Sequence, residues 1–162
     1  MKNIKKWNVW RQIKIPIHKG SADFLEQIEE AEMHVESWAT DYILAHPFEE
    51  RLELFTFPVA RVSAFDLGFP RKQLVTIGEI KAAGQSNGLK MLNAEKILAL
   101  RLGYKDQKKE WMRVAVATMI DKDQSHLDLA LVNDGSRIDI RTTWAFPGNF
   151  FQAEHEWFWE IK

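Results

Sequence analysis

Residues 104–111 combine the side chains best suited to polar binding in this 162-residue chain. Five of them supply hydrogen-bonding groups, carboxylates and aromatic rings, and we take them as candidate binding residues: Tyr104, Asp106, Gln107, Glu110 and Trp111. The segment is expected to join a helix to a strand, and loops held by rigid elements often carry binding residues. The alternative is a solvated connector whose Tyr104 and Trp111 anchor its ends in the core. The sequence favours this second interpretation, and it assigns no catalytic residue.

Metal chemistry has little support in the residue pattern. The chain has no cysteine, which excludes disulfides, thiolate ligands and cysteine nucleophiles. Its histidines do not pair at the spacing of metal ligands within a helix: His18, His34, His46, His126 and His155. Asp121-x-Asp123-x-Ser125 resembles the opening of a calcium loop. The comparison fails further on, because His126 stands where that loop needs glycine and Val132 where it needs glutamate. A polar hairpin turn explains these residues, so we predict no metal and no cofactor.

Phosphate and nucleic-acid binding also lack a signature. The eight glycines are scattered, and a dinucleotide fingerprint, a Walker sequence and the nucleophile pattern G-x-S-x-G are all absent. Predicted helices at 76–87 and 93–103 could form a helix-turn-helix. Against this, the turn between them is long, and the second helix offers few cations beyond Lys96 and Arg101. The 22 basic and 23 acidic side chains leave a formal charge of -1, which argues against a nucleic-acid partner.

Length and composition are those of one ordinary globular domain, expected to span residues 1–162. Apolar residues make up 46% of the chain and charged residues 28%, which is far from a disordered composition. The start is basic, but no apolar run of signal-peptide length follows it. Because 18 consecutive apolar residues never occur, we predict no membrane-spanning helix. A cytoplasmic protein is expected, and the oligomeric state is left open.

The first half of the chain is predicted to be mainly helical. Residues 7–17 alternate like an edge strand, and a further strand is expected at 52–57. Between them, apolar residues recur at helical spacing with no Gly or Pro to divide them, which predicts one long helix from a cap at Ser21 to His46. Trp38 shares a face of this helix with other apolar residues and is expected to be largely buried.

Two shorter helices follow in the sequence. Thr76 and Glu79 have the spacing of a capping box, which predicts a helix start with Gly88 as its stop. Asn93 can cap the next helix, which leads into residues 104–111. Both helices therefore precede the segment that holds the candidate binding residues.

From Trp111 onward the apolar period changes to two, which is typical of strands. Strands near 111–120, 126–133 and 137–145 are predicted to pair as consecutive antiparallel neighbours, with Asp134-Gly135 in the second turn. In a last strand, Trp157 and Trp159 are expected to point inward and Phe158 to lie on a partly wet face. The predicted fold class is α+β, with a helical N-terminal part packed on a C-terminal antiparallel sheet of about four strands.

Several short segments of the chain form a recognisable set. They are Trp38-Ala39-Thr40-Asp41, Leu67-Gly68-Phe69, Glu79-Ile80, Gly88-Leu89, LRLGYKDQ at 100–107, Glu110-Trp111, Ile120-Asp121-Lys122-Asp123 and the Trp-Phe-rich end. Together they resemble a group of bacterial conserved hypothetical proteins to which no activity is attached. The chain departs from that group at 91–93, where similar proteins often carry Cys-Pro, and at 108–109, where they often carry Pro and Gly. The resemblance implies a shared bacterial fold and no mechanism.

Two function hypotheses of different classes follow. The first is a small bacterial protein of the cytoplasm that acts as a protein-binding or accessory module. The second is a small hydrolase or transferase whose carboxylates and histidine are brought together by folding. A weaker third hypothesis is sugar binding by aromatic side chains of the sheet. Perturbed carboxylates in a cleft would favour the enzyme. A large exposed apolar patch would favour the binding module, which the sequence supports better.

Overall fold

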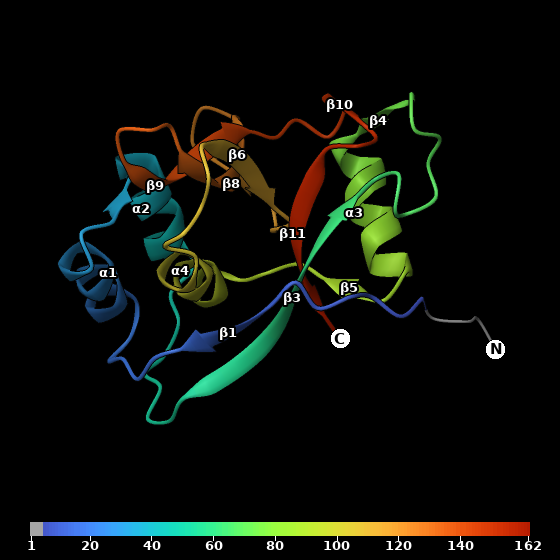
Figure 1. The fold of residues 1–162 in the computed structure, drawn as a ribbon. Coiled ribbons are helices and arrows are strands. Elements are labelled where there is room, and N and C mark those ends of the chain that lie inside the picture. The colour runs from blue at the N-terminus through green and yellow to red at the C-terminus, as the bar shows by residue number, and fades with distance from the viewer. Residues whose placement is uncertain (1–4) are drawn as a thin grey trace.

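The computed structural model describes residues 5–162, which form four helices and a large mixed sheet (Figure 1). The helices are α1 (Ser21–Glu30), α2 (Ser37–Ala45), α3 (Ile77–Ser86) and α4 (Ala94–Gly103). The strands are β1 (Arg11–Ile15), β2 (His34–Val35), β3 (Phe55–Ser63), β4 (Leu74–Thr76), β5 (Leu89–Lys90), β6 (Glu110–Val114), β7 (Met119–Ile120), β8 (His126–Asn133), β9 (Ile138–Trp144), β10 (Phe150–Gln152) and β11 (Glu156–Ile161). No helix within 5–162 has the length and apolar character to cross a bilayer.

The main sheet has nine strands in the order β1-β3-β11-β6-β8-β9-β2, with β5 paired to β11 and β7 to β8. The α+β class is therefore right, but the prediction of about four antiparallel strands is wrong. The last strand, β11, lies between β3, which is antiparallel to it, and β6, which is parallel to it. Periodicity shows which strand residues are buried, but it does not show pairing between distant segments such as β3 and β11.

The antiparallel pairing predicted for the three segments between 111 and 145 is confirmed, but the strand predicted near 111–120 is divided into β6 and β7, both of which pair with β8. Met112 of β6 pairs with Leu131 of β8, and Leu131 pairs with Ile140 of β9. Asp134 and Gly135 lie in the turn between β8 and β9, where Gly135 has a φ of 93° that a side chain would oppose. The period-two pattern and the turn residues predicted this pairing, but not the break after Val114, where Ala115 bonds instead to Phe158 and Leu92.

The long helix predicted from residue 21 to residue 46 is wrong, because two helices with β2 between them occupy this region. Glu32 has a φ of 59°, a left-handed conformation that ends the first helical stretch. Ser21 is not the cap of α1: Gly20 is, and the Ser21 hydroxyl accepts a hydrogen bond from the Phe48 N–H at 3.1 Å. The capping box of Thr76 and Glu79 is confirmed at the start of α3, and the Asn93 side chain caps α4 by accepting a hydrogen bond from the Lys96 N–H.

Helices cover both faces of the sheet, with α1, α2 and α4 on one side of β11 and α3 on the other (Figure 1). Each face has its own hydrophobic core: on β11, Phe158 packs in the core under α1, α2 and α4, whereas Trp157 and Trp159 pack in the core under α3. Both tryptophans have no exposed surface, so their inward orientation is confirmed. Phe158 is equally buried, so its face is dry at this residue, although the side chain of Glu156 on the same face is 43% exposed.

Close packing against the sheet explains why α3 has a glycine at position 84. A Cβ added at Gly84 would lie 2.2 Å from the ring of Trp159, a distance that van der Waals contact forbids. Gly84 therefore allows α3 to approach the sheet closely enough to cover the indole.

Candidate functional site

Residues 104–111 form a connector whose side chains are largely engaged in internal contacts. Arg101 of α4 is fully buried and donates hydrogen bonds to the Gln107 side-chain oxygen at 2.5 Å and to the Tyr104 carbonyl. Gln107 in turn donates from Nε2 to the Leu131 carbonyl at 3.0 Å. Burial lowers the pKa of Arg101 to about 10, so the guanidinium still carries its charge at neutral pH. Gln107 thus holds a buried cation and closes the connector onto β8.

Three other candidate residues, Tyr104, Glu110 and Asp106, take part in two separate contacts. The Tyr104 hydroxyl donates to Glu110 Oε1 at 2.8 Å, and burial together with this hydrogen bond raises the pKa of Tyr104 to about 12. Asp106 lies on the exposed side and forms an ion pair with Arg11 at 2.8 Å. Tyr104, Asp106, Gln107 and Glu110 therefore do not converge on one of the cavities described below. Trp111 is placed differently, because its indole is 48% exposed.

Exposed aromatic side chains gather at the edge of the sheet formed by β9. Trp38 of α2 and Trp144 at the end of β9 are 51% and 52% exposed, and their rings meet edge to face at 6.5 Å. Phe146 stacks on Trp144 with a centroid distance of 6.3 Å. The expectation that Trp38 is largely buried is wrong: its helical neighbours Ala39 and Tyr42 enter the core instead. Outside β9 lies only the short strand β2, which pairs with Asp139 and Ile140 and does not extend to Trp144.

These aromatics line two adjoining hollows, which we call the tryptophan groove. One, of about 280 Å³, has walls that include Glu36, Trp111 and Trp144. The other, of about 450 Å³, runs toward the turn between β7 and β8. Trp38 and Leu127 line both hollows, so the two adjoin at these side chains. Trp111 is the one sequence-predicted binding residue among those that line it.

The second hollow has an acidic rim. Three carboxylates line it, from Asp41 of α2 and from Asp121 and Asp123 of the turn, against one cation, Lys122. Asp121 Oδ1 accepts hydrogen bonds from the backbone N–H groups of Asp123 and Ser125, both at 2.9 Å, which fixes the shape of the turn. The rim therefore places negative charge beside the exposed indole of Trp38, an environment that suits a cation with an apolar neighbour.

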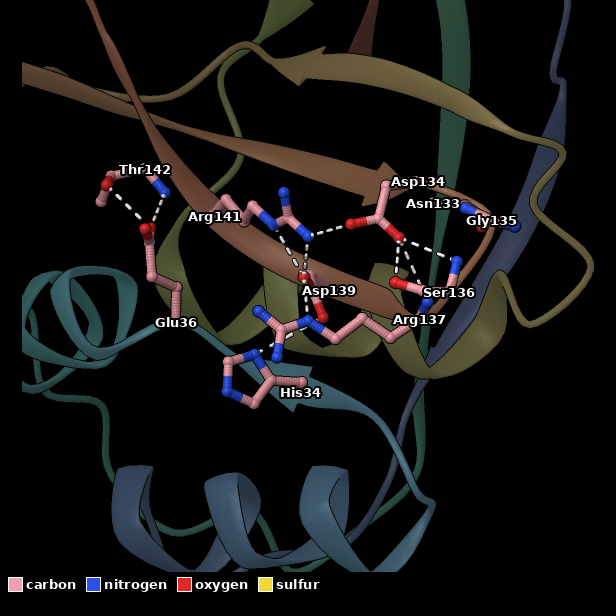
Figure 2. Close-up of polar contacts among 10 residues, drawn as sticks. All are labelled: His34, Glu36, Asn133, Asp134, Gly135, Ser136, Arg137, Asp139, Arg141 and Thr142. Atoms are coloured by element: carbon pink, nitrogen blue, oxygen red, sulfur yellow. Dashed lines mark hydrogen bonds and ion pairs between the residues drawn. The ribbon is translucent and has the colours of Figure 1, made fainter.

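A second charged group lies at the other end of β9 (Figure 2). Asp139 is fully buried, and its Oδ2 accepts hydrogen bonds from Arg137 Nε at 2.9 Å and from Arg141 Nε at 2.7 Å. Arg141 also donates to Asp134 at 2.6 Å, and hydrogen bonds from Ser136 and Arg141 lower the pKa of Asp134. Figure 2 shows both guanidinium groups converging on Asp139.

Glu36 connects this cluster with the groove. Its carboxylate accepts hydrogen bonds from the N–H of Thr142 at 2.7 Å and from the Thr142 hydroxyl at 2.9 Å (Figure 2). The Glu36 N–H donates to the Ile140 carbonyl at 2.9 Å. Glu36 thus fastens the start of α2, and with it Trp38, to the outer edge of β9.

Histidine and carboxylate side chains meet outside the groove. His18 accepts from the Gly20 N–H through Nδ1 and therefore donates from Nε2 to Glu95 at 2.9 Å. Glu95 also holds Arg51 through both carboxylate oxygens, at 2.7 and 2.9 Å. Burial raises the pKa of Glu95, but the hydrogen bonds from Arg51 and His18 outweigh burial and lower it. A carboxylate held in this way is a structural anion and a poor general base.

No protein-family model, curated protein or solved structure matches the chain. Function is therefore inferred from the site itself. The sequence did not single out the groove because its main residues lie far apart along the chain, at 38, 111 and 144, and become neighbours only through the pairing of β6, β8 and β9 and the docking of α2.

Proposed function

We propose that this protein is a binding module that holds a basic, partly apolar segment of another protein in the tryptophan groove. The observation that carries the proposal is the pair Trp38 and Trp144, half exposed and edge to face beside a rim of carboxylates. Exposed indoles are costly to leave in water, and Trp is enriched among the residues that dominate protein interfaces.

The charge of the rim decides the chemistry of the partner. Asp41, Asp121 and Asp123 outnumber Lys122 by three to one along the same wall. A Lys or Arg side chain stacked on Trp38, which lines the same hollow, would gain both a cation–π contact and the field of these carboxylates. An apolar neighbour of that residue would cover the floor formed by Met119 and Leu127.

A small hydrolase or transferase has less support. Within residues 5–162, the ion pairs that join a histidine to a carboxylate are His18–Glu95 and His34–Asp139. Both carboxylates already hold arginine side chains and lie outside the groove. The carboxylates that do line the groove have no histidine among their lining partners.

The test is a selection of displayed random peptides on the immobilised protein. We expect enrichment of peptides with Lys or Arg next to an apolar residue, and a loss of binding of about tenfold or more with Trp144→Ala, as for a central interface tryptophan. Phe55→Ala is the matched control, because Phe55 is an exposed aromatic near the opposite edge of the sheet. Failure to enrich any peptide, or equal binding by Trp144→Ala, would refute the proposal.

A further inference from the structure

The tryptophan groove lies between two charged groups at opposite ends of β9. The acidic rim lies beyond Trp144, and the cluster of Arg137 and Arg141 lies at the start of the strand. Arg141 links this cluster to the groove, because its guanidinium lies 5.6 Å from the ring centre of Trp111, which lines the groove. A bound segment would therefore meet different charges at its two ends.

Asp139 holds both arginines in a defined orientation. Each uses its Nε to donate to the buried carboxylate, so the guanidinium planes are fixed from the inner side (Figure 2). Arg137 makes no hydrogen bond through its terminal nitrogens to any residue in 5–162, and its side chain is 53% exposed. Terminal guanidinium nitrogens that face solvent are suited to a carboxylate, which they can bind through two parallel hydrogen bonds.

The charge around this cluster favours an anion. Arg137 and Arg141 bind the two carboxylates of Asp139 and Asp134, and the side chain of Lys109 lies against the turn at Gly135 and adds a third cation beside them. Asp139 is fully buried, whereas Arg137 and Lys109 are exposed, so the charge that a bound segment would meet at this end is mainly positive. His34, whose Nδ1 is 3.4 Å from Asp139 Oδ1, adds a further positive charge whenever it is protonated.

The length of β9 sets the spacing of the two ends. Seven residues, Ile138–Trp144, span about 20 Å at the rise of an extended strand. An extended partner segment would cover the same distance with about six residue steps. Its two ends could then reach the acidic rim and the arginine cluster together.

We propose that the groove binds its partner segment in one direction, with a Lys or Arg side chain at the acidic rim and an Asp or Glu side chain about six residues away at Arg137. This inference rests on the proposed function and adds the second charge and the orientation. A segment with only a basic end would satisfy the proposed function but leave Arg137 unused.

The experiment repeats the peptide selection with variants of each end. Arg137→Gln and Lys109→Glu alter the basic end, and the second leaves every contact of Asp139 intact, so it remains informative should Arg137→Gln fold poorly. Asp123→Asn alters the acidic end. Sequencing of the enriched peptides then measures the frequency of acidic and basic residues at each position.

With the wild-type protein, we expect an acidic residue about six positions from the basic one. Arg137→Gln and Lys109→Glu should lower that acidic preference by up to about fivefold, as for a partly shielded ion pair, and keep the basic preference. Asp123→Asn should do the reverse. Enriched peptides without the acidic residue, or an acidic preference that both basic-end variants leave unchanged, would overturn the inference while the proposed function stands. No enrichment at all would instead refute the proposed function.

Discussion

Two pairs of tryptophans in this protein share a residue type and differ in almost everything else. Trp157 and Trp159 lie on the central strand β11 and have no exposed surface. Trp38 and Trp144 lie at the β9 edge of the same sheet, and each is about half exposed. The first pair is covered by α3, whereas nothing within residues 5–162 covers the second to a similar extent.

The difference shows that position in the sheet decides what a tryptophan does. β11 has a neighbouring strand on each side and helices on both faces, so its indoles contribute apolar burial. β9 has only the two-residue strand β2 as its outer neighbour, so its last residues remain at an edge. We therefore expect substitutions at the first pair to change stability and substitutions at the second pair to change binding.

The largest effect is expected for Trp159→Ala, with a loss of about 3–5 kcal/mol in the free energy of unfolding, the usual cost of deleting a core aromatic. Denaturant unfolding followed by circular dichroism measures it. Trp159→Phe is the control. Its loss should be clearly smaller, because the aromatic ring remains and the indole N–H has no hydrogen-bond partner within residues 5–162. Equal losses for both variants would argue against packing as the cause.

Gly84→Ala tests the cover over the same indole. The added methyl group would overlap the Trp159 ring, so α3 must move outward, and we expect a loss of about 3 kcal/mol, the upper end for overpacking. The double variant Gly84→Ala with Trp159→Phe should recover part of this loss in the same unfolding experiment. If the losses in the free energy of unfolding of the two single variants simply add in the double variant, steric overlap between the residues at 84 and 159 is not the cause.

Glu95→Gln extends the comparison to a buried carboxylate. Its folded-state pKa lies below the ordinary value of 4.5, so the charged form stabilises the fold above that pH, and this contribution is lost as the pH falls through the lower folded pKa. We expect the variant to lose about 1–2 kcal/mol at pH 7 and to approach the wild type in acid. Thermal melts at several pH values check this. A difference that does not change with pH would rule out the carboxylate charge as its source.

The smallest change in stability is expected for Trp144→Ala. Because half of the side chain already faces water, the free energy of unfolding should change by about 0.5 kcal/mol, as for most surface substitutions. Its melting temperature, compared with that of Trp159→Ala, measures the contrast directly. A loss of stability as large as that of Trp159→Ala would mean that Trp144 is part of the core. The groove could then not be interpreted as a binding surface.

Local patterns predicted local structure well. The capping box of Thr76 and Glu79, the turn at Asp134-Gly135 and the inward tryptophans of β11 all depend on residues close in sequence. The place of β11 between β3 and β6 depends on residues far apart, and no spacing within one strand encodes it.

The site was harder to predict for the same reason. Trp38 has core-like helical neighbours, so its exposure follows from the position of α2 at the sheet edge and not from its own sequence context. Gln107 shows the reverse: an apparently exposed polar residue is buried because it holds Arg101. Trp111 was predicted as a binding residue from its segment, and its place in the groove depends on β6.

The central position of β11 also has a consequence for synthesis on the ribosome. Until residues 156–161 have emerged, the ribbon of β1 and β3 has no strand that joins it to β6, β8 and β9. The nascent chain therefore carries two unfinished half-sheets with open edges, and such edges promote association between chains. Pairings over long sequence separations also form slowly. The period of greatest exposure to aggregation, and of greatest need for a chaperone, should fall just before the last strand becomes available.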